Sequence, residues 1–212
     1  GNVDSRTGKE GLKGLLRKDN DGYYYYDSEQ NYAKLEGDEI ILYSDTYYKN
    51  DGTNPNSGVK TKKIGLFPFD EYDSTAMEEK TPNGGTYQHQ FGMTLSSEFI
   101  YPEGGVLPDT GKPMSFDFSG DDDVWVFVDG VLVLDLGGVH QPINGRINFM
   151  PDSNGKMNVT VTEFDNFCVE YVSTEKSSDV DALFQRANKT FNKTPYSQHR
   201  IDFFYLERGG CD

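Results

Sequence analysis

The sequence predicts a mostly β protein with long loops and one short helix. Of its 212 residues, 23 are glycine, 14 are tyrosine and 14 are phenylalanine. Aromatic and β-branched residues favour strands, whereas glycine favours the turns between them. The dipeptide Asp129-Gly130 stands between two apolar runs, which is the strongest short-range signal of a β-hairpin. No linker interrupts the pattern, so we expect a single domain over residues 1–212.

The first half of the chain predicts strands separated by long loops. Two apolar runs, Tyr23–Tyr26 and Ile40–Tyr43, are expected to form paired strands. Residues 49–63 have no periodicity and many turn formers, which predicts a loop. Residues 88–102 are expected to form a pair of strands.

The second half has the clearest pattern. Met114, Phe116 and Phe118 alternate with polar residues, as in a strand with one buried face. The run 124–128, VWVFV, is continuously apolar, which predicts a strand covered on both faces with Trp125 in the core. Residues 131–136 form the returning strand of the hairpin, and 156–164 and 199–207 form two more. A short helix is expected within 177–190, with Ser178 as its N-cap.

Charge and composition exclude several classes of partner. There are 35 acidic and 20 basic residues, a net charge of −15, so nucleic acid is not expected to bind. No apolar run approaches the roughly 20 residues that span a bilayer, so we expect no membrane insertion. The two cysteines, Cys168 and Cys211, can form a disulfide or remain free thiols, and the sequence leaves both open.

Three consecutive aspartates, Asp121–Asp123, directly precede the most apolar strand. Neighbouring carboxylates repel one another, and their removal from water without compensation costs free energy. A calcium ion reverses that cost, because it takes six to eight oxygen ligands. The spacing alone leaves two interpretations, a solvated acidic turn and part of a metal site.

Catalytic motifs are missing from the sequence. The three histidines, His89, His140 and His199, lie outside any metalloprotease motif, and no serine or cysteine has the sequence context of a known nucleophile. We therefore expect that the chain is not an enzyme.

The segment Phe118–His140, FSGDDDVWVFVDGVLVLDLGGVH, resembles the signature of the fibro-slime domain, a branch of the lectin-like domain family named after the anthrax protective antigen. Tyr87–Thr94 and His199–Gly210 resemble flanking segments of that family. The resemblance covers residues 64–212, with 1–63 as N-terminal strands and loops of the same domain. It implies a jelly-roll-like β-sandwich, found in bacterial and amoebal surface proteins, fungal adhesins and some glycoside hydrolases.

The resemblance also implies a site. In sugar-binding members, two aspartates joined by a cis peptide bind calcium, and the calcium binds sugar hydroxyls. The motif places this pair on Asp121 and Asp122, with Asp123 and His140 beside the ligand. A second loop is expected to add calcium ligands, and its candidates are Glu207, Gly209, Cys211 and Asp212.

We therefore expect a calcium-dependent, lectin-like carbohydrate-binding module of a secreted or cell-surface adhesin, attached to the cell through regions outside this chain. The first alternative is a stalk or tip domain of a surface or pilus protein, which calcium stabilises and which binds a protein on a host or neighbouring cell. The second is a non-catalytic appendage of a glycoside hydrolase.

Overall fold

The structure is a computed structural model that describes residues 11–44, 47–49, 60–62, 65–66, 68, 79–80, 86–87, 90–138, 140, 142–165 and 172–208. The chain divides into two compact units, Gly1–His89 and Gln90–Asp212. Each unit is described by itself. The expectation of one domain over 1–212 stays a prediction.

The first unit contains short strands. Its main sheet has the order β4-β3-β7, and β1 pairs with β2, β5 with β6 and β8 with β9. The strands are β1 Arg17–Lys18, β2 Tyr24–Tyr25, β3 Tyr32–Glu36, β4 Glu39–Tyr43, β5 Tyr47–Lys49, β6 Lys60–Lys62, β7 Gly65–Leu66, β8 Glu79–Lys80 and β9 Thr86–Tyr87. Tyr32, Ala33, Leu35 and Ile40 are buried in this unit.

Two predictions for this unit need correction. The runs Tyr23–Tyr26 and Ile40–Tyr43 do not pair with each other, because the first contributes β2, which pairs with β1, and the second lies in β4, which pairs with β3. The predicted loop at 49–63 overlaps the paired strands β5 and β6, which include residues 49 and 60–62. Its centre, 50–59, lies outside the described residues.

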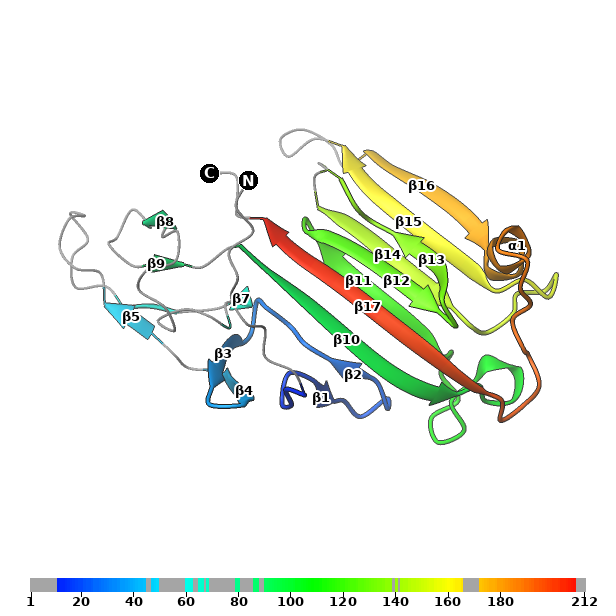
Figure 1. Cartoon of the computed structure of the whole chain (residues 1–212), viewed down its shortest axis with the longest axis horizontal. Helices are drawn as coiled ribbons and strands as arrows, with labels where there is room; N and C mark the ends of the chain where they lie inside the picture. Colours follow the sequence, from blue (N-terminus) through cyan, green and yellow to red (C-terminus); the bar gives the residue numbers. More distant parts are fainter. Residues whose placement is uncertain are drawn as a thin grey trace. The chain divides into compact units, whose positions relative to one another are not determined.

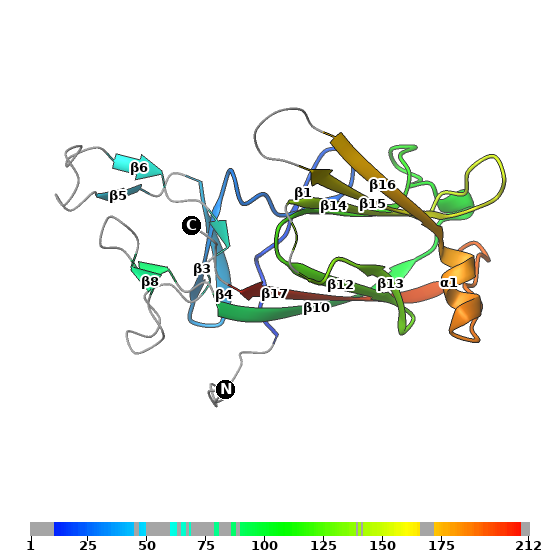
Figure 2. The same ribbon diagram turned by 90° about the horizontal axis from the view of Figure 1, so that it is seen from above.

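The second unit is a β-sandwich, and the prediction of a mostly β fold is confirmed. One layer, here called the β17 sheet, has the order β10-β17-β12-β13, and the other, the β15 sheet, has the order β11-β14-β15-β16 (Figures 1 and 2). The elements are β10 Gln90–Ile100, a 3₁₀ turn Glu103–Gly105, β11 Ser115–Gly120, β12 Asp123–Val128, β13 Val131–Asp135, β14 Ile143–Asn148, β15 Asn158–Asp165, β16 Val172–Asp179, α1 Val180–Arg186 and β17 Gln198–Arg208.

The core lies between the two sheets. Val124, Val126 and Val128 of β12 are fully buried, and Phe116 of β11 contacts Phe203 of β17 across the interface with ring centroids 5.8 Å apart. The prediction that β12 is covered on both faces, with Trp125 in the core, is wrong. Trp125 and Phe127 alternate with the valines and are only partly buried on the outer face of the β17 sheet.

The hairpin between β12 and β13 forms as predicted. Asp129 and Gly130 both have positive φ, 49° and 69°, as a type I′ turn requires. The β12–β13 register shifts between Val126 and Phe127, so the β13 strand carries an extra residue. Because of this bulge, the consecutive residues Val133 and Leu134 are both buried.

Two further local predictions differ from the structure. Residues 90–100 form one long strand, β10, that pairs along its full length with β17, instead of a pair of strands. The helix α1 begins after Asp179, whose carboxylate accepts a hydrogen bond from the Asp181 amide at 3.1 Å, so Asp179 and not Ser178 is the N-cap. Among the described residues, no helix combines the length and the apolar character needed to cross a membrane.

Candidate functional site

The three aspartates occupy the turn between β11 and β12, and each has a different environment. Asp121 is exposed, Asp122 is half-buried, and Asp123, the first residue of β12, is 4% exposed. The described residues contain no cis peptide bond, so Asp121 and Asp122 are joined by a trans peptide. This corrects the cis peptide that the family resemblance implies.

Asp123 holds the segment that follows β13. Its Oδ1 accepts a hydrogen bond from the Gly138 amide at 2.7 Å, and the Asp135 carboxylate accepts one from the Gly137 amide at 3.0 Å. The Trp125 ring lies so close to Gly137 that a Cβ there would be 2.6 Å from it. His140, which we expected beside the ligand, is half-buried with its Nε2 2.7 Å from the Leu136 carbonyl oxygen. One oxygen of Asp123 and one nitrogen of His140 therefore contact backbone groups.

The side chains of Asp122 and Glu207 both contact the hydroxyl group of Tyr205. Because Asp123 pairs with Leu206, the neighbouring Asp122 lies next to the end of β17. The Tyr205 hydroxyl hydrogen-bonds to Asp122 Oδ2 and lies 3.1 Å from Glu207 Oε2. A phenol carries one proton, so it can donate to only one of the two carboxyl groups at a time. The arrangement therefore has more acceptor oxygens than protons.

The pKa values of this cluster follow from burial and like charge. Burial raises the pKa of Asp122 from 3.8 to about 7; the charges of Glu207 and Asp121 also raise it, whereas the hydrogen bond from Tyr205 lowers it. Burial, followed by the hydrogen bond to Asp122, raises the pKa of the Tyr205 hydroxyl. The carboxyl of Asp122 therefore changes its charge near neutral pH in the absence of a cation.

The described residues fit a calcium site in part. Asp122 and Glu207 supply two converging carboxylates, but calcium takes six to eight oxygen ligands. Within the part of the chain that the structure describes, no group of three or more His, Cys, Asp or Glu side chains could hold a metal ion. The predicted ligands Gly209, Cys211 and Asp212 lie outside the described residues.

Sequence reasoning brought Asp122 and Glu207 together through the family resemblance but missed Tyr205. The alternation of β17 contains the signal that could have found it. Residues two apart in a strand face the same side, so Tyr205 shares a face with Glu207, and its hydroxyl is a polar group within the aromatic and apolar run 203–206.

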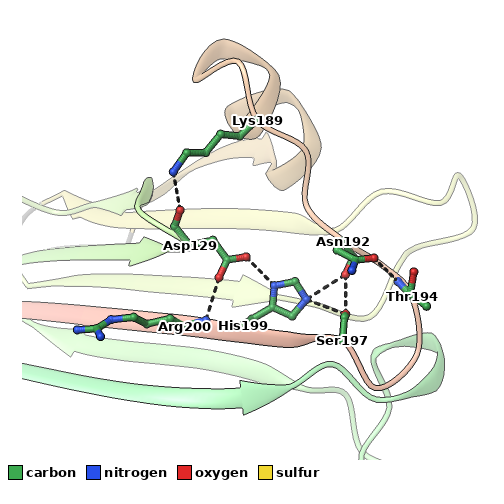
Figure 3. Close-up of polar contacts among 7 residues, drawn as sticks. All are labelled: Asp129, Lys189, Asn192, Thr194, Ser197, His199 and Arg200. Carbon is green, nitrogen blue, oxygen red and sulfur yellow. Dashed lines mark hydrogen bonds and ion pairs between the residues drawn. The ribbon is translucent and has the colours of Figure 1, made fainter.

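A second polar cluster lies at the opposite end of β12 and resembles a hydrolase triad (Figure 3). His199 Nδ1 is 2.6 Å from Asp129 Oδ2, and its Nε2 is 2.9 Å from Ser197 Oγ. However, Nε2 is also 3.0 Å from the carbonyl oxygen of Asn192, to which Ser197 donates a hydrogen bond at 2.9 Å. Because the Ser197 hydroxyl donates its one proton to this carbonyl oxygen, it does not donate to His199 as a catalytic serine would.

The surroundings of His199 also indicate a structural role. The ring is 3% exposed and stacks on Phe191 with centroids 4.2 Å apart. Asp129 additionally accepts a hydrogen bond from the Arg200 amide at 2.9 Å, and its carbonyl accepts one from Lys189 Nζ at 2.7 Å. The cluster thus joins the β12–β13 turn, the start of β17 and the segment after α1. The expectation that the chain is not an enzyme stays a prediction.

Comparison with known proteins finds relatives among the psi proteins of Dictyostelium discoideum. The chain is 33% identical to protein psiQ of Dictyostelium discoideum over 143 residues, which is 63% of this chain. It is 34% identical to protein psiB over 127 residues, which is 58% of this chain. It is 27% identical to protein psiP over 192 residues, or 89% of this chain. The matched regions span 13%, 21% and 21% of these relatives. No family model matches the chain, and no solved structure matches it.

Proposed function

We propose that this chain is a calcium-dependent carbohydrate-binding module of a cell-surface adhesin, with the metal held at Asp122. The observation that carries the proposal is the convergence of Asp122 and Glu207 on the Tyr205 hydroxyl, at the end of the sandwich where the acidic turn lies. Asp122 lies in the turn before β12 and Glu207 lies in β17, so the fold itself concentrates negative charge there.

A divalent cation suits this cluster on chemical grounds. Calcium binds carboxylate oxygens, carbonyl oxygens and water, and it would supply the positive charge that is missing between the two half-buried acids. Asp121 and residues 209–212 are the proposed source of further ligands. When bound, calcium would supply coordination positions for pairs of sugar hydroxyls, and the described residues would hold the metal.

The comparisons support the idea of a module. The chain matches at most about a fifth of the length of the three relatives named above. A region of that size within longer proteins is consistent with one binding unit among several. The fibro-slime resemblance and the extracellular location are part of the same proposal.

A structural role for calcium is the second candidate. Asp123, Asp135 and His140 contact backbone groups of residues 136–138, so the loop beside the acidic turn is held by the protein itself. If this loop does not take part in sugar binding, calcium would serve only to stabilise the fold, as in a stalk or tip domain whose partner is a protein.

A glycan array probed with calcium and with a chelator tests the proposal. We expect glycan binding by the parent in calcium, loss of binding with the chelator, and loss in Asp122→Asn at either condition, since the change is nearly isosteric and removes one negative ligand. Asp109→Asn, in an exposed turn, is the matched control and should bind like the parent. Thermal stabilisation by calcium without glycan binding would favour the structural candidate. The absence of both effects in the parent would refute a calcium site.

A further inference from the structure

We propose that the outer face of the β15 sheet is a second binding site, a groove that takes a neutral oligosaccharide without any metal. The groove has a volume of about 550 Å³. Its polar lining includes Asp117, Ser119, Asn144, Arg146, Thr162 and Glu175. The volume falls within the roughly 300–1,000 Å³ of small-molecule sites. This inference goes beyond the proposed function, because it concerns other residues and needs no calcium.

A glycine of β14 lines the groove and packs closely against the core beneath it. Gly145 of β14 is buried, and a Cβ at this position would lie 2.8 Å from methyl carbons of Leu134 and of Leu136. Without a side chain at 145, β14 lies close against these leucines. On the outer face, Gly145 lines the groove between Asn144 and Arg146, whose side chains point outward on either side of it.

The strand register arranges the lining in two rows. Asp117 lies opposite Arg146, which lies opposite Thr160, and this forms the first row. In the second row, Ser119, Asn144, Thr162 and Glu175 follow one another across four strands. Side chains directly opposite in a sheet are roughly 4.5–5.5 Å apart. Each row therefore offers closely spaced hydrogen-bonding groups, as recognition of a polyhydroxyl chain requires.

The groove contains donors and acceptors that are already oriented. Arg146 forms an ion pair with Asp117, and the other oxygen of Asp117 accepts a hydrogen bond from Ser115 at 2.8 Å. The carboxylate is thus fixed from two sides, yet the Arg146 and Asp117 side chains remain 62% and 47% exposed. A ligand can reach both charged groups without breaking the strands apart.

Charge disfavours an anionic ligand and a hard metal ion. The ion pair leaves Arg146 balanced, so the charged groups of the lining sum to one negative charge, from Glu175. With a net charge of −15, the chain repels anions at long range. Two carboxylates, one of them paired with arginine, provide too few ligands for a hard cation. Sugar hydroxyls, which both donate and accept, match the guanidinium, amide, hydroxyl and carboxylate groups of the two rows.

The test is binding of a panel of neutral oligosaccharides, the manno-, gluco- and galacto-series of three to six units, with a chelator present throughout. Amide NMR shifts locate the site, and titration gives the affinity. We expect at least one series to bind with shifts on β14 and β15. Asn144→Ala and Thr162→Val should each weaken it by about three- to tenfold, the effect of one lost hydrogen bond. Thr94→Val, on the exposed face of the β17 sheet, is the matched control and should change nothing.

The experimental outcomes distinguish the groove from the proposed calcium site at Asp122. Absence of binding by every series with chelator overturns the groove, and so does binding that the Asn144 and Thr162 variants leave unchanged. Binding that needs calcium and is lost in Asp122→Asn supports the site at Asp122 alone. Chelator-resistant binding that depends on Asn144 supports the groove, whatever the outcome at Asp122.

Discussion

Replacement of Asp122 by asparagine should make the metal-free protein more stable at neutral and alkaline pH. Burial raises the pKa of this carboxyl from 3.8 to about 7. The unfolded chain therefore ionises at a lower pH than the folded one, and the folded state loses stability as pH rises from 4 to 7. Each unit between the two pKa values corresponds to about 1.4 kcal/mol, or about 4 kcal/mol in total. Because the side chain is only half-buried, solvent screening reduces this to about 2 kcal/mol.

Asparagine keeps the shape and an oxygen that can accept from Tyr205, but it carries no charge. Denaturant unfolding with a chelator, at pH 4, 5.5, 7 and 8, measures the free energy of unfolding of both proteins. The variant should match the parent near pH 4 and exceed it by about 2 kcal/mol at pH 8. A difference that stays flat with pH, or that shrinks as pH rises, would refute the reasoning.

Asp202 provides a control of opposite sign. Its hydrogen bonds from Arg200 and Ser96 lower the pKa of its carboxyl. A lowered pKa stabilises the folded state above the unfolded pKa, and this contribution is lost as pH falls. Asp202→Asn should therefore be less stable than the parent at pH 7, and the difference should shrink toward acid.

Two further changes test the packing of the sandwich. Asp129→Asn should lower the free energy of unfolding by about 1–3 kcal/mol, because buried His199 loses a carboxylate partner. The control, Asp109→Asn, should change the free energy of unfolding by less than about 0.5 kcal/mol. Equal losses in the two variants would contradict a stabilising role for the polar cluster around His199. Gly145→Ala should cost about 1–3 kcal/mol by overpacking against Leu134 and Leu136. Gly92→Ala is the matched control, because a Cβ at Gly92 would lie no nearer than 3.8 Å to any neighbouring atom. If the two variants unfold at the same temperature, the sheets do not approach closely at residue 145.

Local signals in the sequence were sufficient for the hairpin and for the buried face of β11. Asp129 and Gly130 tolerate the positive φ of a type I′ turn, which few other pairs do, so the turn follows from two residues. The alternation in 114–118 likewise predicted β11 with Phe116 and Phe118 inward, and ring contacts of both with Phe203 bear this out. The helix was predicted as well, although its cap was placed one residue early.

The exposure of Trp125 could not be read from the sequence. A continuous apolar run is compatible with a strand covered on both faces and with one whose outer face is aromatic. The choice depends on what lies over the outer face, and the flanking residues carry no information about that. The same limit applies to the pairing of β10 with β17, which joins segments about a hundred residues apart.

The sequence by itself determined that this is a mostly β chain with an acidic turn before a buried strand, because those features depend on residue type and on periods of two residues. Only the tertiary structure decided which groups meet that turn. The β12–β17 register brings Tyr205 and Glu207 beside Asp122, and the β11–β14–β15–β16 order gathers Asp117, Arg146 and their neighbours into one groove. Both outcomes depend on which distant strands pair, and that choice is made by the packing of the whole core.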